Sequence, residues 1–323
     1  MLAEMKPICQ SRYDIYRLNG NDRYLMLMCV GKQSRLVCAD TGETAATFPD
    51  YKSIFWAEPI SETEFLFRTV GMRYAIYDTA QRRITWDFQY PCGTKNAICD
   101  RRFVWLGNGW LADSYINLNS ARADHDVRPA FALNVQTGEI RELCDVDGDP
   151  VPCIRNGCVG KTGVWLFSPE ALYHFAKGTP IGACERVFMR TSSIGAAMDP
   201  ESGVFYYTGG SGVRAVSMLG EPPRIHRPNS DGDNPFRSDS FRASECVLNP
   251  TGEYLAVIYS RRITASGPFD RTSYIWIHDT LRDKCKAYMA VKTGSATRWT
   301  GNCLYVVGNE CKTVYCFDAA EAK

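Results

Sequence analysis

Histidine and aspartate residues that could exchange protons or bind a metal ion gather in two segments that read as loops. His125 is followed by Asp126, and His226 is followed within a few residues by Asp231 and Asp233. Imidazole and carboxylate groups serve as general acids and bases and as ligands of catalytic metal ions. The chain has only 4 histidines in 323 residues. A small-ligand site, or a metal-assisted hydrolase or lyase site, is therefore the alternative hypothesis.

Arginine and aromatic residues form a second and larger set in the same loops. A guanidinium group offers a fixed fork of hydrogen-bond donors, and aromatic rings supply contact area at low entropic cost, so this mixture is typical of protein recognition. The opposing interpretation is a set of solvated loop charges that pair with one another. The sequence favours a non-catalytic protein–protein interaction module, with these partner-binding residues: Trp110, Tyr115, Arg128, Arg237, Arg261, Arg262 and Arg271.

Both sets must be positioned by a framework, and the sequence predicts that framework from its repeats. Two apolar β runs, the second often ending near an Asp, recur at intervals of roughly 40 to 60 residues. The seven pairs of runs are 24–30 with 35–40, 64–70 with 73–78, 102–106 with 130–135, 163–167 with 171–175, 204–208 with 213–218, 254–259 with 273–279, and 303–307 with 313–318. This period is typical of small antiparallel sheets that bury their faces only against neighbours.

The fold expected from these repeats is all-β, a seven-bladed β-propeller of four-stranded antiparallel blades in one domain over residues 1–323. The expected blades are 12–49, 52–89, 94–144, 152–190, 193–227, 243–291 and 294–318. The last unit ends after its third strand, and an open strand edge invites aggregation. Residues 6–11 are not used by the first blade, so we expect this N-terminal segment to supply the missing outer strand and close the ring.

Two turns carry a resemblance to a known superfamily. Asn249-Pro250-Thr251-Gly252-Glu253-Tyr254-Leu255-Ala256-Val257 and Asp199-Pro200-Glu201-Ser202-Gly203-Val204-Phe205 combine a Pro that sets φ with a Gly that permits positive φ. They resemble the turn between the first and second strands of blades in WD-repeat-like and related bacterial propellers. The pair Trp86-Asp87 falls on an expected fourth strand, whereas WD-repeat proteins place it at the end of the third. The resemblance therefore implies the architecture alone.

The resemblance also implies where the loops lie. In WD-like propellers, the connections between blades and those between second and third strands share one face, called the top. The long connections of this chain, at 107–128, 224–243 and 260–272, are expected on that face. Long loops on a rigid scaffold commonly carry function. The partner-binding set is therefore placed on the top face, and the histidine–aspartate set at the mouth of the central channel.

Other stretches do not add a metal or cofactor site. Asp145-Val146-Asp147-Gly148-Asp149 begins like a calcium loop, but Pro150 stands where that loop needs Gly and Asn156 where it needs Glu. A tight turn is expected instead. The cysteines Cys144, Cys153 and Cys158 lack the close spacing of zinc ligands. No metal and no cofactor is expected.

Composition bounds the remaining possibilities. The 37 basic and 36 acidic residues nearly balance, which argues against a dedicated nucleic-acid binder. The first residues do not read as a signal peptide, and no apolar run is long enough to span a bilayer. Many of the 14 cysteines lie in apolar β runs, where thiols pack as small hydrophobic groups. We expect a cytoplasmic, monomeric protein that binds another protein.

Overall fold

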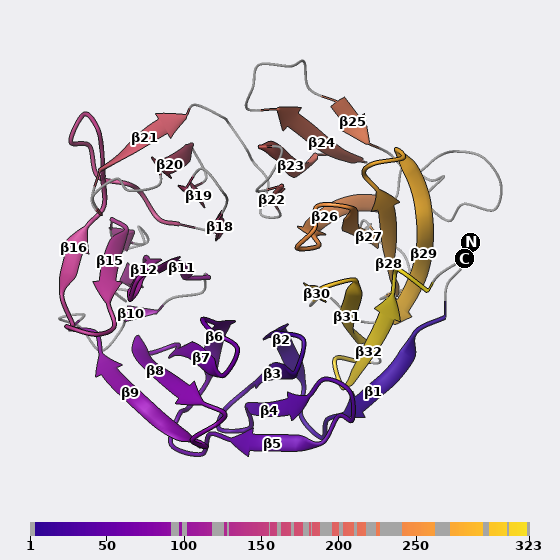
Figure 1. Cartoon of the computed structure of the whole chain (residues 1–323), viewed down its shortest axis with the longest axis horizontal. Helices are drawn as coiled ribbons and strands as arrows, with labels where there is room; N and C mark the ends of the chain where they lie inside the picture. Colours follow the sequence, from indigo (N-terminus) through magenta and orange to yellow (C-terminus); the bar gives the residue numbers. More distant parts are fainter. Residues whose placement is uncertain are drawn as a thin grey trace.

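The chain folds into β-sheets that lie around a common centre (Figure 1). The computed structural model describes residues 4–91, 97–98, 102–117, 126–127, 129–154, 156–159, 163–168, 171–176, 181, 183–187, 196–199, 203–209, 212–217, 224–226, 241–261, 272–292, 297–308 and 310–321. Strands are the only regular elements among these residues. The same part of the chain accordingly holds no helix of the length and apolarity that crossing a membrane requires.

Three four-stranded antiparallel sheets come from the first half of the chain. The first contains β2 (Ile15–Gly20), β3 (Tyr24–Cys29), β4 (Arg35–Cys38) and β5 (Thr44–Thr47). The second contains β6 (Ile54–Pro59), β7 (Glu64–Thr69), β8 (Arg73–Asp78) and β9 (Arg83–Gln89). The third contains β11 (Val104–Gly107), β12 (Trp110–Asp113), β15 (Phe131–Asn134) and β16 (Ile140–Glu142).

Four further sheets follow in chain order. The fourth contains β18 (Asn156–Val159), β19 (Gly163–Phe167), β20 (Leu172–Ala176) and β21 (Ala183–Val187), and the fifth contains β22 (Ala196–Met198), β23 (Val204–Gly209), β24 (Gly212–Ser217) and β25 (Arg224–His226). The sixth contains β26 (Phe241–Leu248), β27 (Tyr254–Arg261), β28 (Thr272–Asp279) and β29 (Lys284–Lys292). The seventh combines β30 (Thr297–Thr300), β31 (Cys303–Gly308) and β32 (Thr313–Asp318) with β1 (Lys6–Gln10).

The N-terminal strand β1 completes the seventh sheet, as expected from the missing outer strand. β1 pairs antiparallel with β32, with Lys6 opposite Cys316 and Gln10 opposite Thr313. The backbone N of Ser11 also donates to the carbonyl O of Lys312 (2.7 Å). The edge of β32 is therefore covered by a strand from the other end of the chain (Figure 1).

The innermost strands of the seven sheets are β2, β6, β11, β18, β22, β26 and β30 (Figure 1). β2 contacts β6 and β30, β18 contacts β11 and β22, and β26 contacts β22 and β30. Between β6 and β11 the backbone N of Trp105 donates to Glu58 Oε2 (3.2 Å). Each innermost strand is thus in contact with the innermost strands of the preceding and following sheets.

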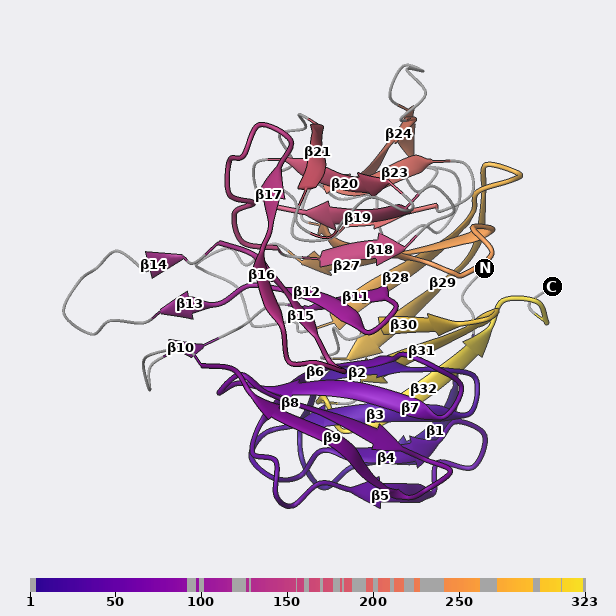
Figure 2. The ribbon, with the colours of Figure 1, turned by 60° about the vertical axis from the view of Figure 1, so that its left-hand side comes forward.

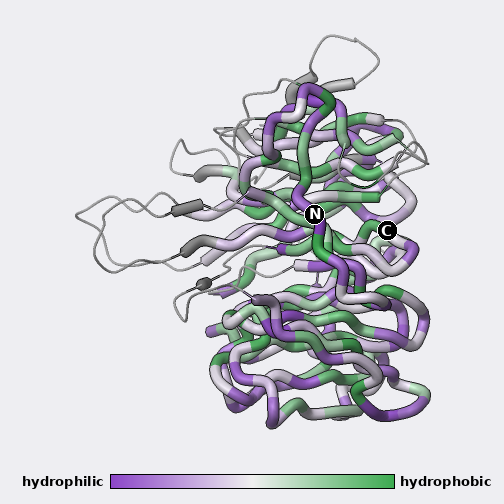
Figure 3. Tube along the Cα trace, turned by 90° about the vertical axis from the view of Figure 1, so that its left-hand side faces the viewer, coloured by the Kyte–Doolittle hydropathy of each residue, from purple (hydrophilic) through white to green (hydrophobic). Residues whose placement is uncertain are grey.

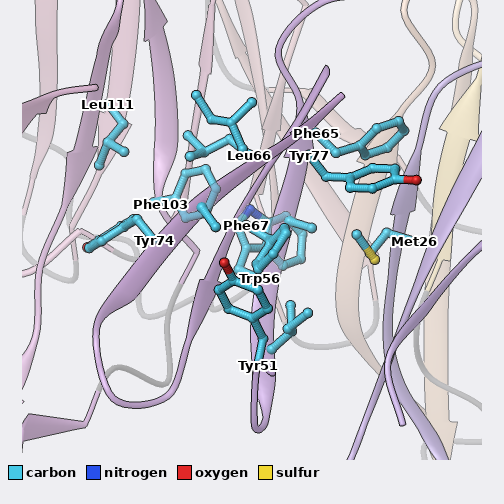
Figure 4. Close-up of a cluster of buried hydrophobic side chains, with 14 of the residues drawn as sticks. Met26, Tyr51, Trp56, Phe65, Leu66, Phe67, Tyr74, Tyr77, Phe103 and Leu111 are labelled. Carbon is cyan, nitrogen blue, oxygen red and sulfur yellow. The ribbon is translucent and has the colours of Figure 1, made fainter. Parts of the chain in front are cut away.

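Hydrophobic side chains are buried between neighbouring sheets. Figure 4 shows part of the largest cluster, in which Trp56 and Phe67 lie between Met26 of the first sheet and Leu111 of the third. The rings of Tyr51 and Phe67 meet edge to face at 4.9 Å. Figure 3 shows hydrophobic stretches along the stacked strands and hydrophilic residues at many of the turns. The sheets bury their faces against one another, as the period predicted.

Side-chain oxygens hold many of the turns, which explains the recurring Asp after third strands. Asp78 Oδ1 accepts from the backbone N of Ala80 (2.7 Å), and Asp318 Oδ1 accepts from that of Ala320 (2.8 Å). Before second strands, Asn249 Oδ1 accepts from the backbone N of Tyr254 (2.9 Å), and Gly252 has φ +77. The predicted turn between β26 and β27 is therefore confirmed, with Gly252 at positive φ as expected.

The third sheet differs from the expected arrangement. The run at 102–106, predicted as a second strand, overlaps β11, which is the innermost strand of this sheet. The true second strand is β12, which follows the tight turn at Gly107, Asn108 and Gly109, all with positive φ. The long connection therefore begins after Asp113 rather than at Gly107.

Two smaller elements were not predicted. β10 (Ala97–Ile98), β13 (Ile116–Asn117) and β14 (Asp126–Val127) form a three-stranded sheet that projects from the body of the molecule (Figure 2). β17 (Cys144–Asp145) pairs in parallel with β21 and extends the fourth sheet to five strands. β13 and β14 lie within the long connection of the third sheet, whereas β10 precedes the first strand of that sheet.

Candidate functional site

Each innermost strand is an edge strand of its sheet. Its backbone groups on the unpaired side, which faces the centre of the fold, therefore need other hydrogen-bond partners. Polar side chains from neighbouring sheets supply several of them. Asn19 Nδ2 donates to the carbonyl O of Ala57 (2.6 Å), and the Tyr16 hydroxyl donates to that of Ile54. The Trp105 amide uses the Glu58 carboxylate. The sequence therefore places polar groups on otherwise apolar first strands.

Five charged residues meet at this centre, and we call them the central arginine cluster. Arg17 lies in β2, Glu58 in β6, Arg102 just before β11, Glu245 in β26 and Arg298 in β30. All five are partly buried. Their charges influence one another directly, because Arg17 is repelled by Arg102 and attracted by Glu245, while Arg298 is attracted by Glu58. Five of the sheets contribute to this one cluster.

An ion pair joins the third and sixth sheets within the cluster. Arg102 Nη2 donates to Glu245 Oε1 at 2.5 Å. The guanidinium carbon of Arg102 also lies 4.6 Å from the ring centroid of Trp56, a cation–π contact. The side chains of Arg102 and Glu245 remain 22% and 23% exposed. The pair is thus formed at a place that solvent reaches.

Glu58 is held by two hydrogen bonds in less polar surroundings. Its Oε1 accepts from Trp56 Nε1 (3.1 Å), and its Oε2 accepts from the Trp105 amide (3.2 Å). Burial raises the pKa of the Glu58 carboxyl, and the positive charges of Arg298 and Arg102 only partly oppose that effect. Burial at this position therefore disfavours the charged form of the carboxyl.

Burial makes the positive charges of the other two arginines, Arg17 and Arg298, energetically unfavourable. Burial, together with repulsion from Arg102, lowers the pKa of Arg17 to about 10, and its guanidinium lies 4.2 Å from the ring centroid of Phe55. Burial also lowers the pKa of Arg298. Arg298 Nε is buried and has no hydrogen-bond partner among the described residues. An additional negative group would relieve both guanidinium groups.

A neighbouring ion pair differs from the Arg102–Glu245 pair because solvent does not reach it. Arg68 of β7 and Asp113 of β12 are fully buried, with side chains 0% exposed, and form a direct ion pair. The Tyr74 hydroxyl donates a further hydrogen bond to Asp113 Oδ2 (2.7 Å). This pair joins the second and third sheets inside their shared core and is inaccessible to solvent. We read it as structural.

The charge balance of the central arginine cluster is positive. Three guanidinium groups, of Arg17, Arg102 and Arg298, face two carboxylates, of Glu58 and Glu245, which leaves a surplus of one positive charge among the described residues. Chemically, the arrangement offers fixed N–H donors and positive potential, which suit an anionic group.

Two of the predicted partner-binding residues, Trp110 and Tyr115, lie near opposite ends of β12. Trp110 begins β12, beside the turn from β11, whereas Tyr115 lies just beyond the other end of that strand. The Arg141 guanidinium covers the Trp110 ring at 5.1 Å. Tyr115 packs against Tyr90, with ring centroids 5.6 Å apart. The expectation that both residues share the long loop is therefore wrong, because the second strand of this sheet starts at Trp110.

Three other predicted site residues lie at the ends of strands. Arg261 ends β27, Asp126 begins β14 and His226 ends β25. The remaining members lie outside the described residues: Arg128, Arg237, Arg262, Arg271, His125, Asp231 and Asp233.

The two described histidines outside the predicted site are packed against aromatic rings. His174 stacks on Trp165 with ring centroids 4.2 Å apart, and His278 lies 4.8 Å from Trp276. Asp145 Oδ1 accepts from the backbone N of Asp147 (3.1 Å) and of Asp149 (2.9 Å), which confirms the tight turn. All twelve described cysteines are free thiols.

The sequence interpretation missed the central arginine cluster altogether. Its members lie up to 281 positions apart (298 minus 17), so no local spacing marks them. The available signal was a charged residue within or beside a first-strand run, as in Ile15–Gly20, Ile54–Pro59 and Thr297–Thr300. Such strands meet at the centre, so their charges must meet there too.

Comparison with known proteins gives no assignment. No protein-family model matches the chain, and no curated protein matches it. The functional argument therefore depends on the geometry of the chain itself.

Proposed function

We propose that this chain is a single-domain, seven-bladed β-propeller of the WD-repeat-like type, whose ring is closed by β1. Three observations support this architecture: the seven sheets in chain order, the contacts between successive innermost strands, and the pairing of β1 with β32. The Pro–Gly turn before β27 adds to the resemblance.

We propose that the function is binding rather than catalysis, and that the central arginine cluster binds an anionic group. The observation that carries this proposal is the meeting of Arg17, Arg102 and Arg298 around only two carboxylates, with Arg298 Nε lacking a partner among the described residues. Guanidinium groups keep their protons at neutral pH, so they position and neutralise an anion rather than transfer protons to it.

The test is thermal denaturation of the full chain with low concentrations of phosphate or citrate at constant ionic strength. A ligand that binds only the folded state stabilises it by about 2.7 kcal/mol at a hundredfold excess over Kd. We expect saturable stabilisation in the wild type and its loss in Arg298→Gln. The matched control is Arg141→Gln, because Arg141 pairs with Glu139 on the exposed β16 (2.7 Å). An equal response in wild type and Arg298→Gln would refute the proposal.

A second candidate function is capture of a partner protein by the top-face loops. The projecting sheet of β10, β13 and β14 favours it, because this sheet extends the long connection of the third blade away from the body (Figure 2). Affinity capture from native lysate tests it, with the triple variant Arg261→Ala, Arg262→Ala, Arg271→Ala for comparison. A protein recovered in stoichiometric amount with wild type alone would support this candidate, and identical recoveries would remove it.

A further inference from the structure

We propose that Glu245 is a built-in competitor for the anion site, and that the ligand is a carboxylate that displaces Glu245 from Arg102. The inference deepens the proposed function and rests on it. Without a ligand, the Arg102 guanidinium pairs with the carboxylate of Glu245. An external carboxylate takes the place of Glu245 on the same guanidinium group.

The geometry shows that Glu245 reaches Arg102 from a distant part of the fold. Arg102 precedes β11 of the third sheet, and Glu245 lies in β26 of the sixth. The fourth and fifth sheets separate them along the sequence, and β18 and β22 make the contacts between β11 and β26. The pair thus does not hold two adjacent sheets together, which is what the Arg68–Asp113 pair does.

Solvent exposure decides which of the two pairs can exchange its carboxylate. The Arg102 and Glu245 side chains are 22% and 23% exposed, whereas those of Arg68 and Asp113 are 0% exposed. If Glu245 leaves Arg102, both charged groups can be solvated where they are. If Asp113 left Arg68, an uncompensated charge would remain in the core. Only the Arg102–Glu245 pair is therefore suited to reversible opening.

Arg102 is prepared to receive a second carboxylate. A guanidinium group has five N–H donors, and the hydrogen bond to Glu245 uses Nη2 alone. The cation–π contact with Trp56, at 4.6 Å, holds the group independently of Glu245. An incoming carboxylate can bind the guanidinium through two parallel hydrogen bonds, which are stronger than one. Arg17, which Glu245 also helps to neutralise, would gain from the same ligand.

The resident group identifies the ligand class. A position that accepts a glutamate side chain has the size and donor arrangement for a planar carboxylate. Small dicarboxylates and acidic peptide side chains share this chemistry. The probe is glutarate, which reproduces the glutamate side chain with a second carboxylate, and a short glutamate-containing peptide distinguishes the two sources.

The experiment is calorimetric titration of glutarate into the full-length wild type and into Glu245→Gln. Removal of the competing carboxylate should tighten glutarate binding by about tenfold or more. The matched control is Asp87→Asn, which makes the same change in net charge at an exposed arginine pair on β9, where Asp87 lies 2.6 Å from Arg73. We expect this control to bind glutarate like the wild type.

Each outcome decides a different statement. Binding in wild type that is no tighter in Glu245→Gln overturns the competitor role and leaves the proposed function standing. If neither glutarate nor the glutamate-containing peptide binds either protein, the carboxylate ligand is overturned, and the response of the wild type to phosphate or citrate decides the proposed function. Tightening by Asp87→Asn as large as by Glu245→Gln would reduce the effect to net charge and overturn the inference. Phosphate that binds Glu245→Gln as tightly as glutarate would overturn the carboxylate class.

A second variant keeps the test valid if Glu245→Gln fails to fold. Glu245→Asp retains the charge but shortens the side chain by one methylene, so its carboxylate no longer reaches Arg102 at 2.5 Å. We expect glutarate to bind this variant more tightly than wild type but less tightly than Glu245→Gln. Wild-type affinity in a folded Glu245→Asp protein would argue against displacement. A peptide that binds while glutarate does not would assign the site to a protein partner.

Discussion

Replacement of Arg17 by methionine should stabilise the protein, although it removes a residue with several contacts. Arg17 is partly buried, and both burial and the neighbouring Arg102 oppose its positive charge, so that its pKa falls from its ordinary value to about 10. Methionine has a similar length and no charge. It can therefore keep much of the packing near Phe55 without the electrostatic cost.

The magnitude follows from the change in pKa. One pKa unit corresponds to about 1.4 kcal/mol, so the charged Arg17 costs on the order of 3 kcal/mol in the folded state before any allowance for solvent. Partial exposure reduces that value through screening. The lost cation–π contact with Phe55, at 4.2 Å, removes about 1 kcal/mol of stabilisation. The expected net gain in the free energy of unfolding is about 1 kcal/mol.

Urea denaturation at neutral pH, followed by circular dichroism, measures this difference. The sign of its pH dependence is fixed: Arg17 is protonated in both states below about pH 10, so the cost is complete there and fades as the pH rises toward 12.5. Arg68→Met is the matched control, because it leaves Asp113 buried without its cation. That variant should lose about 3 to 5 kcal/mol.

A clear destabilisation by Arg17→Met would refute the reasoning. It would mean that the Arg17 charge is compensated in the folded protein and acts as a structural group, like that of Arg68. The surplus of positive charge in the central arginine cluster would then not exist in the form described.

Other parts of the fold give sharper stability predictions. Gly163→Ala should lower the free energy of unfolding in urea by more than about 2 kcal/mol, because the added Cβ would lie 1.8 Å from the carbonyl O of Phe175. Gly31→Ala, whose added Cβ would lie in open space among the described residues, should lower it by about 1 kcal/mol. Equal losses would contradict the predicted clash. Deletion of β1 should uncover β32 and cause concentration-dependent self-association in light scattering, and an unchanged, monodisperse protein would show that the pairing is dispensable. Asn249→Ala should lose about 2 kcal/mol, because Oδ1 accepts from the Tyr254 amide; Asn249→Asp keeps that acceptor, so it should lose less in the same assay.

The framework was largely predictable because its signals are local. Apolar runs of β-forming residues alternate with turns whose Asp, Asn, Pro and Gly residues have defined backbone roles, and the pairing of β1 with β32 follows from one missing strand. The third sheet was misread because β11 and β12 are two short apolar runs with only Asn108 and Gly109 between them. Periodicity alone does not distinguish a first strand from a second.

The candidate site was not predictable by the same means. Its charged groups come from five sheets, and what unites them is the position of first strands at the centre of the fold. Misplacing β11 also hid Arg102, which then appeared to flank a second strand. Sequence reasoning favours loop arginines and histidines as site residues because loops commonly carry function. A single charged residue in an apolar strand carries no such local signal. The signal becomes visible only after the topology is known.

The pairing of β1 with β32 has a consequence for folding during synthesis. The other strands of the seventh sheet follow one another along the chain, but Gln10 must find Thr313, about 300 positions later. Joining segments so far apart costs roughly 3 kcal/mol more chain entropy than joining segments ten residues apart. β1 therefore leaves the ribosome first among the strands and finds its partner last. Until that moment β1 has no partner strand in the nascent protein, and the late β1–β32 contact is the step at which a chaperone or a second nascent chain would compete.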